Sequence, residues 1–162
     1  MKGKIITFVS HKSHHPSESQ KMKKEYTLDE LLHKAASYCS ISEHCISEVS
    51  DKLTGWGIAT TEREKIISRL IQDDFINEKR FCVAFTKDKF HFNKWGKIKI
   101  SYALKQKGLP NDLINNALRT IDDGEYEEML AVILKNKLKT IQWEYEYEKH
   151  GTLFAFAQSR GF

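Results

Sequence analysis

Apolar positions recur every three or four residues along most of this chain, which is the period of an amphipathic helix. No stretch alternates strictly between apolar and polar residues over the length of a strand. The pattern therefore predicts an all-α fold. The predicted helices span about 28–38, 42–54, 61–72, 77–91, 95–107, 110–121, 124–139 and 150–159.

Several of these helices carry recognisable start signals. Thr27 with Glu30, and Thr61 with Glu64, have the spacing of a capping box, in which each side chain satisfies a free backbone donor. Pro110 suits a first helical turn because it lacks the amide that would be unpaired there. These signals predict helix starts next to Thr27, Thr61 and Pro110.

A phrase that ends in glycine occurs three times in the sequence. Two apolar residues four positions apart are followed, four positions later, by glycine and another apolar residue. The phrases are Val49-x3-Leu53-x3-Gly57-Ile58, Ile100-x3-Leu104-x3-Gly108-Leu109 and Leu153-x3-Ala157-x3-Gly161-Phe162. Each is predicted to close a helix, with the glycine in the left-handed conformation that caps a helix end, and Gly55 is assigned to such a position as well.

The repeated phrase predicts an elongated array of three tandem three-helix units that share their cores. The expected divisions are a first unit over 27–76, a second over 77–123 and a third over 124–162. The third unit is expected to be incomplete, because position 162 falls where the last helix of the other units begins. Residues 1–26 lack apolar periodicity and are expected to form a mobile tail.

Composition narrows the class of protein. The 162 residues include only 8 Gly and 2 Pro, which favours long helices over turn-rich β structure. The longest apolar run, 129–134, is far too short to span a bilayer. The odd count of 3 cysteines without a C-x-x-C pair argues against a disulfide framework. A soluble cytoplasmic protein without membrane contact is expected.

Charge is concentrated in the middle of the chain. Residues 77–107 carry 9 basic and 2 acidic groups, within a chain whose net charge is +4. Such a field is directed at an anionic partner, although a solvated basic helix face has the same pattern. The residues predicted to bind that partner are Arg80, Lys94, Lys97, Lys99, Lys105 and Lys107.

Two interpretations fit the predicted helix 95–107. Its core side would carry Ile100 and Leu104, and its other side interleaves basic and apolar residues, namely Lys94, Trp95, Ile98, Lys99, Tyr102 and Lys105. This second side could contact phosphates while its aromatic rings stack, or bind an acidic groove of a protein. Alternatively, the three apolar residues could pack against the neighbouring unit.

Nothing in the sequence indicates an enzyme. Phosphate loops, nucleophile elbows and His-Glu-x-x-His motifs are absent, so no catalytic residue, metal or cofactor is predicted. Cys39, His44 and Cys45 lack the fourth ligand that a zinc site normally has. The pairs 73–74 and 122–123 offer two carboxylates each, but they fall at helix boundaries, where capping is expected instead.

Two segments of the middle of the chain resemble the RecX family. Within the run 73–82, Glu78, Arg80 and Phe81 follow the order acidic residue, any residue, Arg, Phe. This run is followed by Gly96-Lys97-Ile98-Lys99-Ile100 and Leu104-Lys105-Gln106-Lys107-Gly108-Leu109. The run 158–162, Gln-Ser-Arg-Gly-Phe, is similar to the ending of a family motif. Departures include Cys82 in place of alanine and Lys99 in place of arginine.

The resemblance implies a role that the residues alone do not supply. RecX proteins are three-helix-repeat regulators that lodge in the groove of the RecA–DNA filament and restrain its ATPase and strand-exchange activities. The expected partners are thus the RecA filament and single- or double-stranded DNA. A sequence-nonspecific DNA-binding protein that acts on recombination indirectly, and a helical scaffold without nucleic acid, are the alternatives.

Overall fold

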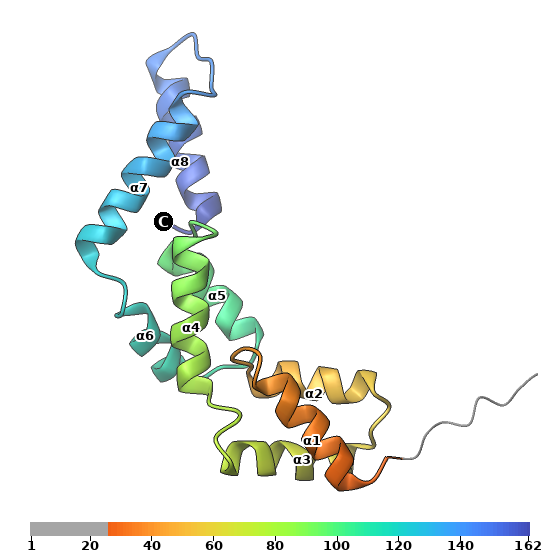
Figure 1. Ribbon diagram of the computed structural model, residues 1–162. Coiled ribbons are helices and arrows are strands. Elements are labelled where there is room, and N and C mark those ends of the chain that lie inside the picture. The colour runs from red at the N-terminus through yellow and green to blue at the C-terminus, as the bar shows by residue number, and fades with distance from the viewer. Residues whose placement is uncertain (1–25) are drawn as a thin grey trace, which may run out of the picture.

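The computed structural model describes residues 26–162, and all secondary structure within them is helical (Figure 1). The prediction of an all-α fold is therefore confirmed. The predicted tail lies outside the described residues except for its last residue. The helices of the described part are α1 (Leu28–Cys39), α2 (Ile46–Gly55), α3 (Thr60–Gln72), α4 (Glu78–His91), α5 (Lys97–Gln106), α6 (Asn111–Leu118), α7 (Asp123–Leu138) and α8 (Glu146–Arg160).

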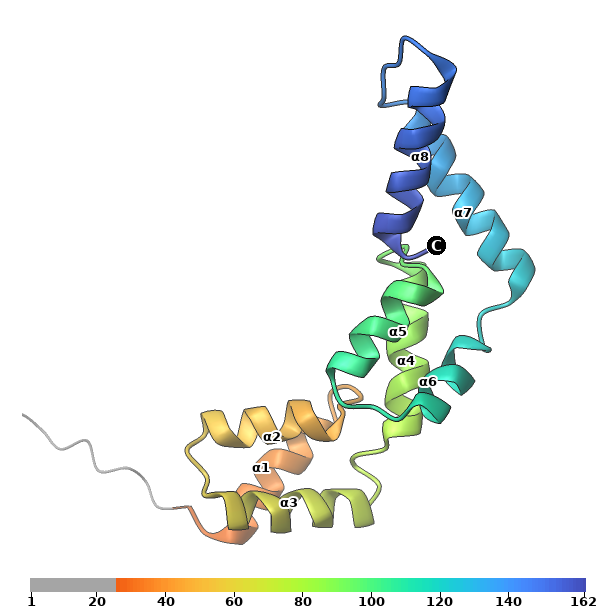
Figure 2. The ribbon, with the colours of Figure 1, turned by 180° about the vertical axis from the view of Figure 1, so that it is seen from behind.

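The helices form an elongated molecule with a bend. Helices α1–α3 lie together as a base, α4–α6 stand on it as a column, and α7 with α8 extend the column (Figures 1 and 2). The end of α8 returns to the loop between α4 and α5, so the chain end lies midway along the molecule. None of the helices in the described part combines the length and the apolar character that crossing a membrane requires.

Buried side chains form two separate cores. The first lies among α1–α3, where α3 packs against both α1 and α2, and it includes Val49, Leu53 and Leu70. The second lies among α4–α6, where α6 packs against α4 and α5, and it includes Phe90 and Ile100. The predicted boundaries between the three units stay predictions, although each of these cores falls largely within one of them.

The three glycine phrases end their helices in the same way. Gly57, Gly108 and Gly161 have positive φ angles of 77°, 81° and 88°. In each case the amide after the glycine donates to the carbonyl five residues earlier. These bonds are Ile58 to Leu53, Leu109 to Leu104 and Phe162 to Ala157. They satisfy free carbonyls of the last turn. The prediction for Gly55 is wrong, because it is the last residue within α2.

The predicted start signals are only partly right. The Thr27 hydroxyl accepts from the Glu30 amide at 3.2 Å and the Glu30 carboxylate accepts from the Thr27 amide at 2.8 Å, so this capping box is confirmed. The predicted box at Thr61 is wrong, because α3 already begins at Thr60 and an internal residue cannot cap its own helix. Pro110 is the extended residue before α6, outside its first turn.

The first helix of each predicted unit begins with a polar cap. Thr27, Asn77 and Asp122 each accept a hydrogen bond from the amide three residues later, at the starts of α1, α4 and α7. The middle helices α2 and α5 have no such side-chain bond at Cys45 and Gly96. Their first amides must therefore find partners elsewhere.

Candidate partner-binding surface

Helix α5 begins where α8 ends. The amides of Gly96 and Ile98 donate to the carbonyls of Arg160 and Gly161, at 2.8 and 3.0 Å. The amide between them donates to the Tyr126 hydroxyl at 3.3 Å. The positive end of the α5 dipole thus meets the negative end of α8. These backbone bonds fix the direction of α5 and therefore the face that it exposes.

That face carries two large apolar side chains in solvent. Ile98 and Tyr102, one helical turn apart, are 68% and 65% exposed, whereas Ile100 and Leu104 on the opposite side are fully buried. The interpretation that Ile98 and Tyr102 pack against a neighbouring unit is therefore wrong. Neighbouring units meet α5 at its two ends and leave this side uncovered. Trp95 differs, because it is half-buried and packs against the second core.

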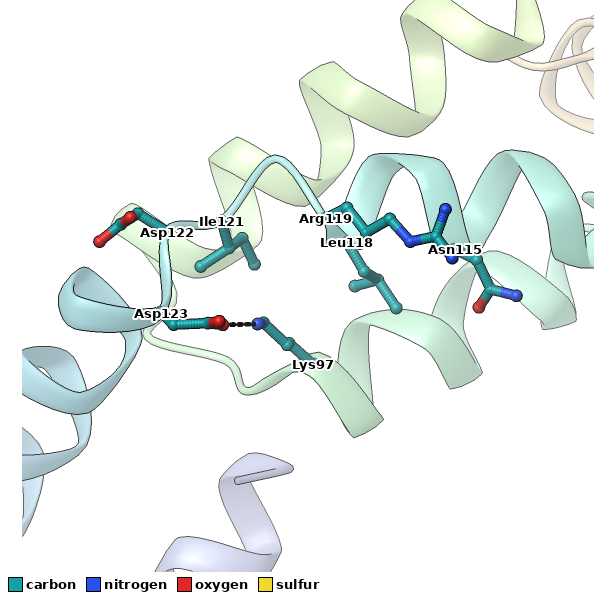
Figure 3. Close-up of a pocket in the computed structure, with 7 residues that line it drawn as sticks. All are labelled: Lys97, Asn115, Leu118, Arg119, Ile121, Asp122 and Asp123. Carbon is teal, nitrogen blue, oxygen red and sulfur yellow. Dashed lines mark hydrogen bonds and ion pairs between the residues drawn. The ribbon is translucent and has the colours of Figure 1, made fainter.

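Two adjoining hollows follow this face. One, of about 410 Å³, is lined by Ile98, Tyr102 and Lys105 of α5 and by Leu118 of α6. The other, of about 450 Å³, continues toward the start of α7 and is shown in Figure 3. Arg119 extends beside this second hollow from the end of α6. Sequence reasoning missed Arg119, because it lies outside the basic segment and only the packing of α6 on α5 brings it there.

The predicted lysines of this region have different surroundings. Lys97 forms an ion pair with Asp123 at 2.9 Å (Figure 3). Lys99 donates to the Ser159 carbonyl at 3.0 Å and lies over the Trp95 ring. Lys105 is exposed and forms no ion pair with any residue between 26 and 162. Its charge is therefore available to a partner.

Lys94 is exposed, like Lys105. Its ammonium contacts the Met129 sulfur at 3.9 Å. Lys94 precedes α5 and lies near the start of that helix, where the end of α8 meets it. This position is away from the two hollows. The cations that lie beside the exposed face of α5 are consequently Lys105 and Arg119, whereas Lys94 lies farther along the molecule.

Arg80 and Lys107 lie elsewhere, at the junction between α1–α3 and α4–α6. The Arg80 guanidinium pairs with Glu43 at 2.9 Å and with Asp74 at 2.5 Å. Lys107 pairs with Glu48 at 2.6 Å. The structure therefore does not bring these two predicted binding residues onto the exposed face of α5.

The charges at this junction hold each other ionised. Burial acts to raise the pKa of Glu48, but hydrogen bonds from Lys107 and His44 outweigh it, so that the pKa of Glu48 is lowered. The hydrogen bond to Glu48 raises the pKa of Lys107. Both groups are therefore charged at neutral pH.

The remaining candidates for chemistry are the two carboxylate pairs and the possible metal ligands. Asp122 caps α7 as expected, by accepting from the Glu125 amide at 3.1 Å. The expectation that Asp74 caps a helix is wrong, because Asn77 performs that role for α4 and the Asp74 carboxylate instead accepts from the Asn77 amide group and Arg80. Among residues 26–162, no three side chains of metal-ligating type gather in one place.

Comparison with known proteins adds the family. A family model described as RecX, second three-helix domain, matches residues 77–118. The chain is 32% identical over 109 residues to a regulatory protein RecX of Lactobacillus johnsonii, an alignment that covers 67% of this chain and 40% of that protein. It is 29% identical over 131 residues to the regulatory protein RecX of Prosthecochloris aestuarii, covering 81% and 84% of the two chains. The chain belongs to the RecX family.

Solved structures of RecX proteins share the fold. The crystal structure of RecX from Lactobacillus salivarius matches with a TM-score of 0.73 at 21% identity, covering 83% of this chain and 88% of that one. A second crystal structure, of a regulatory protein RecX, matches with a TM-score of 0.74 at 18% identity over 83% of this chain and 68% of that one. The fold is therefore shared with solved RecX structures. The relatives found by sequence are named regulatory protein RecX.

Proposed function

We propose that this RecX-family chain is a non-enzymatic regulator in the bacterial cytoplasm that binds the RecA–DNA filament and restrains its ATPase and strand-exchange activities. The proposal rests on the family and on one observation: Ile98 and Tyr102 are exposed side by side, next to the free charge of Lys105. Exposed tyrosine and aliphatic anchors flanked by a cation are typical of a surface that a partner covers.

The exposed face of α5 suits a protein component of the filament. Double-stranded DNA presents one negative charge about every 1.7 Å of its axis, and binding it without sequence preference takes a row of available cations. Lys97 and Lys99 already have partners within the chain, which leaves Lys105 and Arg119 beside the hollows. Two apolar anchors with few free cations favour contact with protein over contact with phosphates alone.

The experiment is a titration of the protein into single-stranded-DNA-dependent ATP hydrolysis by the cognate recombinase. We expect suppression below stoichiometric amounts and weak binding to the same DNA alone. Tyr102→Ala should raise the concentration needed for half-suppression by about tenfold or more. Tyr147→Ala is the matched control, because Tyr147 is similarly exposed, at 72%, but lies at the start of α8.

The alternative of a sequence-nonspecific DNA-binding protein predicts a different result. Hydrolysis would be unchanged, and binding to bare DNA would weaken with salt at a slope of about −0.9 in log K per phosphate neutralised. Equal loss of suppression in Tyr102→Ala and Tyr147→Ala would contradict the assignment of the α5 face.

A further inference from the structure

The first and second cores are joined mainly by charged side chains. Helices α1–α3 pack among themselves and α4–α6 pack among themselves, so the two groups bury their apolar faces separately. What crosses between them comes largely from the segment 43–48, which leads into α2, and reaches the start of α4 and the end of α5, which both face α1–α3 (Figure 2).

One crossing is made by Arg80 on α4. Its guanidinium Nε donates to the Glu43 carboxylate at 2.9 Å, ahead of α2. Its other nitrogens donate to the carboxylate of Asp74 at 2.5 Å and to the Asp74 carbonyl at 2.8 Å. Arg80 thereby ties α4 both to the loop before α2 and to the linker after α3.

The other crossing is made by Lys107 at the end of α5. Its ammonium pairs with Glu48 at 2.6 Å, and its backbone carbonyl accepts from the Ser47 hydroxyl at 2.9 Å. Glu48 also binds the His44 imidazole at 3.0 Å. The side chains of Lys107 and Glu48 are 28% and 29% exposed, so water and ions still reach this pair.

Apolar contact across this junction is small. Cys45, between the two crossings, is fully buried and belongs to the second core although it precedes α2. A cysteine side chain buries little area, whereas the junction carries two ion-paired cations. The neighbouring junction between α5 and α8 is different in kind, because backbone bonds of Gly96 and Gly161 form it.

We propose that Arg80 and Lys107, with Glu43, Asp74 and Glu48, form an electrostatic clasp that sets the position of α1–α3 relative to α4–α6 and can open while both cores stay folded. Partly exposed ion pairs are individually weak and are screened by salt, whereas the two cores are apolar and respond little to moderate salt. The clasp is thus the element of the fold that ionic strength loosens first.

The cysteines of the chain offer a built-in test. Cys45 precedes α2 but is buried in the second core, so opening of the junction should expose it, whereas Cys39 is buried within the first core. A thiol-specific maleimide is added to the full chain at low and at 0.5 M salt, a concentration at which charges are screened beyond about 4 to 5 Å. The rate of labelling at each cysteine is then followed by mass spectrometry of its peptides.

Three variants are compared with the unchanged chain. In Arg80→Gln with Lys107→Gln, labelling of Cys45 should be about tenfold faster or more at low salt, while Cys39 stays protected. The charge swap Glu48→Lys with Lys107→Glu, which leaves Arg80 in place, should keep much of the protection seen in the unchanged chain. Lys149→Gln is the matched control, because it removes an ion pair with Glu146 within α8, away from the junction.

Two results would overturn the proposal. Unchanged labelling of Cys45, both in the double variant and at high salt, would show that the charges do not hold the junction. Parallel acceleration at Cys39 and Cys45 would show that the first core unfolds when the pairs are broken, so that no separate opening exists.

Discussion

Gly96 and Gly161 are in direct backbone contact. A Cβ atom added to Gly96 would lie within 3.0 Å of the carbonyl oxygen of Gly161, and one added to Gly161 would lie within 3.0 Å of the backbone nitrogen of Lys99. Real Cβ atoms do not approach backbone so closely, so both positions require glycine. This contact is what allows the last turn of α8 to hydrogen-bond the first turn of α5.

We expect Gly96→Ala to separate α8 from α5. The added methyl group meets backbone, which cannot move aside like a flexible side chain, so the free energy of unfolding should fall by about 1–3 kcal/mol. Urea unfolding followed by circular dichroism measures this. Gly151→Ala is the control, since Gly151 lies within α8 with nothing near its missing Cβ, and alanine there should stabilise the protein by about 0.5–1 kcal/mol. A Gly96→Ala protein as stable as the unchanged chain would refute the contact.

At Gly108 the effect of backbone conformation can be measured without steric crowding. Its φ angle is 81° and nothing lies within 4 Å of the place that a methyl group would take, so alanine there is opposed by backbone strain alone. Gly108→Ala should cost about 1–2 kcal/mol of stability, and Gly108→Asn less, because asparagine enters the left-handed region more readily. Thermal unfolding of both variants gives the comparison. A neutral Gly108→Ala would mean that α5 does not need its left-handed ending.

Acid should weaken the clasp through Glu48. Because the folded-state pKa of Glu48 is lowered, the stability it contributes is present above the unfolded-state pKa of about 4.3 and is lost as the pH falls through the lower folded-state value. The groups that face it are the Lys107 ammonium and the imidazole of His44. Glu48→Gln should therefore flatten the dependence of stability on pH below about 4.5, with a loss of about 1 kcal/mol at neutral pH. Parallel curves for the two proteins would contradict this.

Lys105 and Lys107 lie at the same helix end but should behave differently. Lys105→Gln should leave the free energy of unfolding within about 0.5 kcal/mol of the unchanged chain while weakening suppression of the recombinase ATPase. Lys107→Gln removes a partly buried ion pair and should cost about 1 kcal/mol of stability. Chemical unfolding and the ATPase titration, run on both variants, distinguish a residue of the exposed α5 face from a residue of the clasp. The reverse pattern would show that the two lysines are wrongly assigned.

Sequence alone predicts the features that are local. The three glycine endings depend on residues within one or two helical turns, and all three have the expected left-handed geometry. The predicted start of α3 is misplaced because the residue that precedes the helix is Ala59, which makes no capping bond with its side chain. A helix that starts without a polar cap leaves no such signal in the sequence.

The long-range features lie beyond prediction from one sequence. Ser47 and the Lys107 carbonyl are 60 positions apart, and nothing in their local sequence indicates a partner. The same holds for the exposure of Tyr102, because its helical position suits both a buried seam and a free face. Only the end-to-end meeting of α5 and α8, which keeps neighbouring helices off that side, decides between them.

The bonds at the start of α5 also bear on the order in which the protein is completed on the ribosome. The amides of Gly96 and Ile98 donate to the carbonyls of Arg160 and Gly161. These two residues are synthesised only at the end of α8, after α6 and α7. Until then these amides lack their partners in the finished fold. The middle of the molecule thus reaches its final form only when a much later segment has emerged and folded back onto it.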